Sequence, residues 1–93
     1  MKLRFERGAL ADLEEILEYI AKNNRRAAAQ LVARIEQATA EIAEQPYLGA
    51  ATRNPEFRRF PVGNYLIVYE VGSNEVIVHY VRHGARPRAW EGE

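Results

Sequence analysis

The stretch that decides the fold is residues 56–90, EFRRFPVGNYLIVYEVGSNEVIVHYVRHGARPRAW. It divides into three short apolar runs at 56–62, 65–71 and 75–83, followed by a basic tail at 84–93. Glycine and asparagine, which occupy tight turns readily, separate the runs. The pattern predicts three antiparallel strands joined by two hairpins.

Two helical patterns and a short strand precede this meander. Residues 2–6 alternate between polar and apolar and predict a strand, whose pairing the sequence leaves open. Apolar residues at helical spacing predict helices over 9–22 and 25–44, and a two-residue junction is typical of an antiparallel helix hairpin. We therefore expect a single α+β domain over residues 1–93, with two layers: the hairpin packed on an antiparallel sheet of about four strands.

Composition excludes several classes of function. Cysteine is absent, which excludes disulfides and thiolate metal sites. Two histidines without neighbouring acidic ligands do not predict a metal site, and no glycine-rich phosphate loop predicts a cofactor. No apolar run approaches the roughly 20 residues of a membrane helix, and residues 1–4 do not begin a signal peptide. We expect a soluble, cytoplasmic protein.

The formal net charge of zero hides an uneven distribution. Residues 50–90 carry three glutamates and six arginines, which are Arg53, Arg58, Arg59, Arg82, Arg86 and Arg88. The planar guanidinium group forms forked contacts with phosphate or carboxylate, so this half of the chain predicts an anionic ligand or an acidic protein partner. A solvated surface is the alternative.

The predicted sheet is apolar on both faces at residues 65–69 and 76–78. An antiparallel sheet with one face in water alternates apolar and polar residues. Two helices cover only one face, so the other must be covered by the tail, by a second copy or by another protein. The chain is interpreted as one that binds a partner.

His83 is a candidate for RNA cleavage, together with Arg59, Arg82 and Arg86. Such chemistry needs a base, an acid and a cation at the phosphate. His79 lies four residues before His83, so a regular strand places both on one face but about 13 Å apart, too far for a dyad. We therefore favour a structural role for His83.

The last aromatic residue, Trp90, lies beside Arg86 and Arg88. Tryptophan and arginine contribute much of the binding energy at interfaces. This basic, aromatic end is either a partner-binding tip or a lid on the sheet.

Four strings occur in order along the chain: ALADLEEI at 9–16, QPYLG at 45–49, RRFPVGNYLIVY at 58–69 and VRHGAR at 81–86. With the order strand, helix hairpin and meander, they resemble the RelE/ParE family of bacterial toxins from type II toxin–antitoxin systems. The resemblance covers nearly the whole chain. It implies a RelE-like fold, growth inhibition, a role in plasmid stabilisation and a cognate antitoxin.

The resemblance implies one of two activities. RelE-like members cleave mRNA at the ribosome, whereas ParE-like members poison DNA gyrase. The nuclease branch has basic residues on the first meander strand, an arginine after the tyrosine that opens the next, an arginine after the glycine that ends the last, and a tyrosine near the C-terminus. Arg58, Arg59 and Arg86 fit this pattern, but Leu66 and Trp90 occupy the second and fourth positions.

The ParE-like branch is therefore preferred, and the chain is interpreted as a binding protein rather than an enzyme. It would form a toxin–antitoxin hetero-oligomer and meet nucleic acid only through its target. The predicted gyrase-binding residues are Arg82, His83, Arg86, Arg88 and Trp90. The predicted antitoxin-binding residues are Leu13, Leu17, Ile20, Arg53, Phe57 and Arg59. In the alternative, a ribosome-dependent endoribonuclease acting on mRNA, the catalytic residues are Arg58, Arg59, His83 and Arg86.

Overall fold

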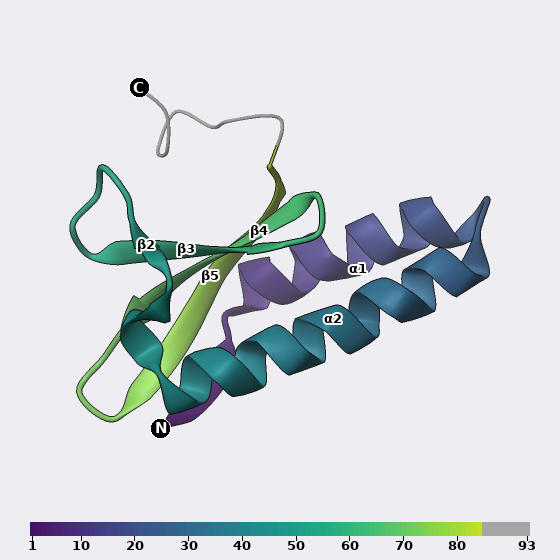
Figure 1. Ribbon diagram of the computed structural model, residues 1–93. Helices are drawn as coiled ribbons and strands as arrows, with labels where there is room; N and C mark the ends of the chain where they lie inside the picture. Colours follow the sequence, from purple (N-terminus) through teal and green to yellow (C-terminus); the bar gives the residue numbers. More distant parts are fainter. Residues whose placement is uncertain (85–93) are drawn as a thin grey trace.

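The computed structural model describes residues 1–84 and has two layers, a helix hairpin packed against a sheet (Figure 1). The hairpin consists of α1 (Arg7–Ala21) and α2 (Arg25–Glu44), and a short 3-10 turn, η1 (Pro46–Leu48), follows it. The strands are β1 (Lys2–Phe5), β2 (Ala50–Ala51), β3 (Phe57–Val62), β4 (Tyr65–Val71) and β5 (Glu75–His83). The predicted α+β class and the helix hairpin are confirmed.

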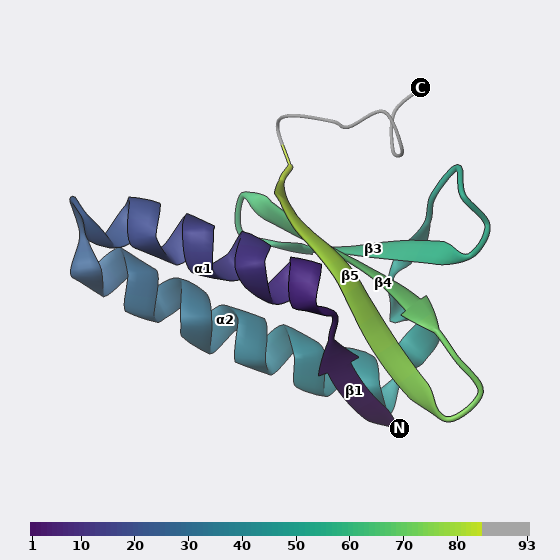
Figure 2. The same ribbon diagram turned by 180° about the vertical axis from the view of Figure 1, so that it is seen from behind.

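The sheet has five strands in the order β1-β5-β4-β3-β2. The pairs β2–β3, β3–β4 and β4–β5 are antiparallel. In contrast, β1 lies parallel to β5, with Lys2 opposite Glu75 and Phe5 opposite Val78 (Figure 2). Parallel neighbours need a long connection, which the helix hairpin and the other strands provide here. The sheet is therefore mixed, and it gains the two-residue strand β2, which sequence analysis did not predict.

Most element boundaries follow the local sequence. The helix α2 and the strands β4 and β5 begin and end where predicted, while β1 ends one residue earlier and β3 begins one residue later. The helix α1 begins at Arg7, because Glu6 is its N-cap and the Glu6 carbonyl accepts from the Leu10 amide at 3.0 Å. Gly8 lies in the first turn and does not break the helix.

The core lies between the hairpin and one face of the sheet. Its helical part is the predicted stripe on α2, which consists of Leu31, Ile35, Ala38 and Ile42. Its fully buried sheet residues are Ile67, Tyr69, Val76, Val78 and Val81. Four apolar residues of α1 pack against this cluster and are half-buried: Leu13, Ile16, Leu17 and Ile20.

A β-bulge redirects the second half of β5. The ladder with β4 skips His79, so Val78 and Val81 both face the helix-side core although they are three residues apart. Regular alternation does not allow that spacing, whereas one extra residue does. The expectation that His79 and His83 share a face is therefore wrong, because the bulge inverts the alternation between them.

The face of the sheet away from the helices also carries a buried residue. Val68 has no exposed surface, yet it does not belong to the helix-side core. Its partners in the ladders are Arg59 on β3 and Tyr80 on β5. This second face therefore mixes apolar and charged groups, and it is less uniformly apolar than the sequence pattern indicates.

Candidate functional site

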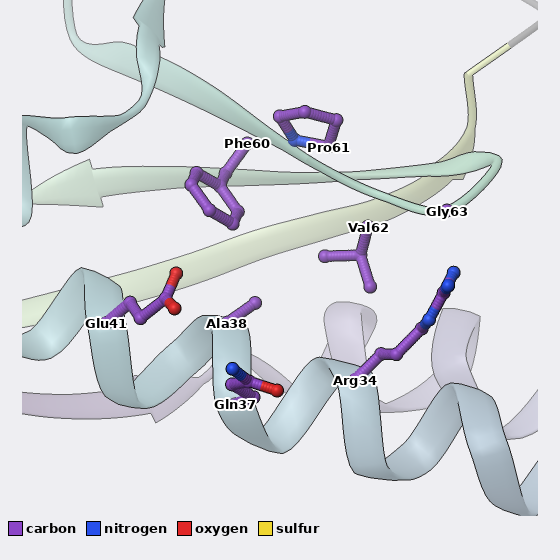
Figure 3. Close-up of a pocket in the computed structure, with 8 residues that line it drawn as sticks. All are labelled: Arg34, Gln37, Ala38, Glu41, Phe60, Pro61, Val62 and Gly63. Atoms are coloured by element: carbon purple, nitrogen blue, oxygen red, sulfur yellow. The ribbon is translucent and has the colours of Figure 1, made fainter.

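A groove runs between α2 and the outer edge of β3 (Figure 3). It has a volume of about 230 Å³ and is lined by Arg34, Gln37, Ala38, Glu41, Phe60, Pro61, Val62 and Gly63. The strand β2 pairs only with Arg58 and Arg59, so it leaves the rest of this edge open. Ala38 presents only a methyl group, which leaves space below the ring of Phe60.

A second hollow of about 320 Å³ continues the groove toward the turn between the helices. It is lined by Ile20, Ala27, Gln30, Leu31, Arg34, Gly63, Asn64 and Tyr65. Arg34 and Gly63 border both hollows. Gly63 has a φ of 60°, and a Cβ there would lie 2.9 Å from Nη1 of Arg34. Glycine therefore lets the β3–β4 turn approach the Arg34 side chain closely.

Two side chains of opposite charge lie along the groove. Arg34 and Glu41 are seven residues apart on α2, which separates them by about 10 Å along the same side of the helix. Within residues 1–84 neither side chain has a hydrogen bond or an ion pair. Sequence analysis missed both residues. The available signal was their spacing on either side of Ala38, beside the apolar stripe.

The predicted antitoxin-binding residues of α1 belong mainly to the core. Leu13, Leu17 and Ile20 are half-buried and pack against the core cluster. Of these three, only Ile20 lines the groove. The large exposed apolar residues of α1 are instead Leu10 and Tyr19.

The remaining predicted antitoxin-binding residues lie apart from the groove. Arg53 is exposed in the connection between β2 and β3. Phe57 faces away from the helices, where its ring lies 5.0 Å from that of His79. Arg59 lies two residues further along β3, on the same face as Phe57. The structure therefore does not bring the predicted set together on one surface.

Arg58 holds the segment that follows α2. Its Nη1 donates to the Gly49 carbonyl at 2.6 Å, and its guanidinium group lies 4.9 Å from the centre of the Tyr47 ring. Arg59 is the next residue of the strand and is exposed on the opposite face. Two of the three arginines of the nuclease alternative, Arg58 and Arg59, thus point in opposite directions.

The Tyr69 hydroxyl fixes the same segment from the core. It accepts from the Gly49 amide at 2.8 Å and donates to the Pro46 carbonyl at 2.7 Å. Burial raises the pKa of this phenol, against smaller lowering effects of the Gly49 hydrogen bond and of Arg58. A Cβ at Gly49 would lie 2.6 Å from the hydroxyl oxygen. This buried contact explains the glycine of the QPYLG string.

Asp12 of α1 binds the edge of β5 at a point beyond the last residue that pairs with β1. Its Oδ2 accepts from the Val81 amide at 3.2 Å and pairs with Nη1 of Arg82 at 2.7 Å. The Arg82 guanidinium also lies 5.0 Å from the centre of the Tyr80 ring. Each charged side chain is only 20% exposed. The predicted gyrase-binding residue Arg82 is therefore held within the fold.

His83 lies at the exposed end of β5. Its ring meets that of Tyr65 edge-on at 5.2 Å, beside a hollow of about 200 Å³ between α1 and the strand ends. The other predicted gyrase-binding residues, Arg86, Arg88 and Trp90, lie outside the described residues. The structure therefore places two members of this set, at adjacent positions of one strand.

His79 contacts two carboxylates. Its Nε2 lies 2.8 Å from Oε1 of Glu70, and its Nδ1 lies 3.8 Å from Oε2 of Glu6. Both ring nitrogens therefore face acidic side chains of the fold. The histidine links the end of β1 to β4 across β5, which is a structural role that sequence analysis did not assign.

Two kinds of site are absent from the part of the chain that the structure describes. Within residues 1–84, no group of histidine and acidic residues could hold a metal ion. In the same part of the chain, no helix has both the length and the apolar character needed to cross a membrane. Among residues 1–84, the feature best suited to a partner is the groove, where Arg34 and Glu41 have no partner within that range.

Comparisons with known proteins identify relatives of this chain. Residues 3–88 match the family model described as the ParE toxin of the type II toxin–antitoxin system, parDE. A comparison with curated proteins finds no match. Among solved structures, a chain of the chromosomal ParDE system from P. aeruginosa is similar, with a TM-score of 0.76 and 19% identity over 89% of this chain and 95% of that one.

Two further structures share the fold. A chain of the RelBE2 toxin–antitoxin complex from Mycobacterium tuberculosis has a TM-score of 0.63 and 23% identity, over 88% of this chain and 95% of that one. The YoeB/ParE toxin from Agrobacterium tumefaciens has a TM-score of 0.65 and 17% identity, over 89% and 98%. Since the family match spans nearly the whole sequence, the chain belongs to the ParE toxin family of type II toxin–antitoxin systems.

Proposed function

We propose that this toxin inhibits growth by binding and poisoning DNA gyrase, and that a cognate antitoxin neutralises it by direct binding. The observation that supports this target is the way the fold uses its basic side chains. Arg58, Arg82 and His79 are each bound to a carbonyl or carboxylate of the protein itself. Leu66 occupies the position where the nuclease branch has an arginine.

RNA cleavage needs a base, an acid and a cation around one phosphate. In the described part of the chain, Arg58 and Arg59 point to opposite faces, and His79 directs both ring nitrogens at carboxylates. A protein target requires no such convergence, since a few large anchors supply most of the affinity. Binding is therefore the proposed mode of action, and it would take place in the cytoplasm with gyrase.

The proposed target-facing surface is the end of β5 and the segment after it. His83 is exposed there, and Arg86, Arg88 and Trp90 follow in the sequence. These residue types form the strongest anchors of protein interfaces. In this proposal, Arg82 contributes by holding the strand end against α1.

The antitoxin is proposed to place an acidic, amphipathic segment in the groove between α2 and β3. Ala38, Phe60 and Val62 give the groove apolar lining, and Arg34 supplies a cation. Apolar burial should supply most of the affinity and charge mainly the association rate. Binding should therefore weaken as salt is added without being lost.

Measuring both candidate activities with one purified protein tests the target. We expect inhibition of gyrase supercoiling and accumulation of gyrase-cleaved DNA, with intact mRNA in a translation extract. In cells, the DNA-damage response should precede any loss of mRNA. Cleaved mRNA with unaffected gyrase would replace this proposal by the nuclease alternative.

Two variants locate the active surface. Truncation after Ala85 should abolish growth inhibition while leaving the fold and antitoxin binding intact, because every helix and strand of residues 1–84 remains. Arg59→Ala is the matched arginine variant, since Arg58 also holds the loop after α2. A harmless but folded Arg59→Ala protein beside a fully toxic truncation would contradict the proposed surface. Circular dichroism checks folding in both.

A further inference from the structure

We infer that the groove selects its partner by charge, and that it takes an amphipathic helix with a carboxylate opposite Arg34 and a basic side chain opposite Glu41. The two partner residues would lie about two helical turns apart. This inference rests on the proposed binding of an antitoxin segment in the groove. It assigns Arg34 and Glu41 as the residues that determine specificity.

The edge of β3 favours a helix over an added strand. The Phe57 carbonyl accepts from Oγ1 of Thr52 at 3.2 Å, so it points toward the β2 side. Backbone groups alternate in direction along a strand, which places those of Pro61 on the same side, beyond the end of β2. Proline has no N–H to donate, and a proline at an edge discourages strand addition.

The length of the groove matches a helix of moderate size. Its two hollows extend along α2 from Ala27 to Glu41, a distance of about 21 Å at 1.5 Å per residue. A partner helix of about 14 residues covers that distance. The partly exposed apolar side chains that it would cover are those of Ile20 and Phe60, and the buried Leu31, Ala38 and Val62 form the floor.

The charges would give the groove its selectivity. Arg34 borders both hollows and Glu41 borders only the first, so the cation is central and the anion lies toward the C-terminal end of α2. Neither has a partner within residues 1–84. A partner helix with one acidic and one basic residue pairs with both Arg34 and Glu41. A helix with two acidic residues places one of them against Glu41, and a helix with two basic residues places one against Arg34. Rejection by repulsion is a common basis of specificity.

Three labelled peptides test this inference. Each has about 18 residues and the same apolar stripe, with Glu and Lys, two Glu or two Lys seven residues apart beside the stripe. Fluorescence anisotropy at low salt measures their binding to toxin made by cell-free synthesis. The unmodified toxin should bind the Glu/Lys peptide about fivefold to tenfold more tightly than the others. Glu41→Lys should prefer the Glu/Glu peptide, and Arg34→Glu the Lys/Lys peptide.

Glu36→Lys is the matched control, because Glu36 is exposed on α2 outside the groove. It should keep the original order of preference, and circular dichroism should show the same fold in every variant. The same order in all variants, an equal change in the control, or no binding of any peptide overturns the inference. So does self-association that Arg34→Glu abolishes, since a second copy would then occupy the groove. The assay contains no gyrase, so a negative gyrase result would leave its outcome intact.

Discussion

The two helices meet the sheet in opposite ways. At the β5 side, Asp12 of α1 pairs with Arg82, so the two charges are paired within the chain. At the β3 side, α2 presents Arg34 and Glu41 across an open groove, and neither has a partner within residues 1–84. A largely buried pair contributes to folding because breaking it leaves a desolvated charge. Exposed charges contribute little to folding and remain available to a partner. The comparison predicts that the boundary between α1 and β5 stabilises the fold and that the boundary between α2 and β3 recognises a partner.

The largest stability effect is expected from Asp12→Ala. The variant leaves the Val81 amide and the Arg82 guanidinium without their acceptor. It should lower the free energy of unfolding by about 2 kcal/mol, in the range for a charge-assisted hydrogen bond at a largely buried position. Urea denaturation measures the change.

Asp12→Asn refines this result. The amide oxygen can still accept from the Val81 N–H but no longer carries a charge. The loss should therefore be about half as large as for alanine. Equal losses for the two variants would assign the effect to the ion pair alone. If neither variant loses stability, the contact between Asp12 and Arg82 does not stabilise the fold, and this side of the comparison is wrong.

The next largest stability effect is expected at Tyr69. Its hydroxyl group makes hydrogen bonds within the chain to the segment that follows α2. Tyr69→Phe removes a hydroxyl that accepts from Gly49 and donates to Pro46. The buried Gly49 amide then lacks its acceptor, so stability should fall by about 1–2 kcal/mol. Thermal and urea unfolding measure it.

The same residue gives a pH dependence with a definite sign. Burial raises the pKa of Tyr69 in the folded protein above its ordinary value of 10.0. As pH rises past 10.0, the unfolded chain loses this proton first, so unfolding becomes more favourable. The contribution of Tyr69 is complete below that pH and is lost as pH rises through the folded-state pKa. Above pH 10.0, the unmodified protein should therefore lose more stability than Tyr69→Phe does.

A smaller effect is expected from Arg58→Ala. Its guanidinium donates to the Gly49 carbonyl and covers the exposed Tyr47 ring. Because the site is only partly buried, the cost should be about 1 kcal/mol. Limited proteolysis in the segment 45–51 should increase in parallel. Unchanged proteolysis would show that Tyr69 alone holds this segment.

Local patterns were sufficient to predict the regular elements. The stripe of α2 and the strands β4 and β5 depend on residues close in sequence, and their bounds were predicted correctly. The parallel pairing of β1 with β5 was not predictable, because it joins residues about 70 positions apart and no local pattern encodes it. The bulge at His79 was not predictable for a related reason. It follows from the packing of both Val78 and Val81 in the same core, which the local sequence does not indicate.

The candidate site was harder to predict than the fold. Leu13 and Leu17 were predicted to contact the antitoxin, and the structure shows that both also pack against the core cluster. Arg82 was predicted to face the target, and the structure shows that it also pairs with Asp12. The apolar or charged character of a residue does not by itself indicate whether its side chain makes contacts within the chain or with a partner. That depends on which element lies opposite, which for Arg34 is the turn at Gly63.

The smallest stability effect, and the sharpest test of the comparison, is expected at the groove. Arg34→Ala and Glu41→Ala remove exposed side chains that have no partner within residues 1–84, so each should change the free energy of unfolding by less than about 0.5 kcal/mol. Arg34→Ala should still weaken the binding of an acidic helical peptide severalfold, because Arg34 is the only cation among residues 1–84 that lines the groove. Asp12→Ala should show the reverse, with reduced stability and unchanged peptide binding. If Arg34→Ala destabilises the protein as much as Asp12→Ala does, the groove is part of the folding core, and the division between the two boundaries is wrong.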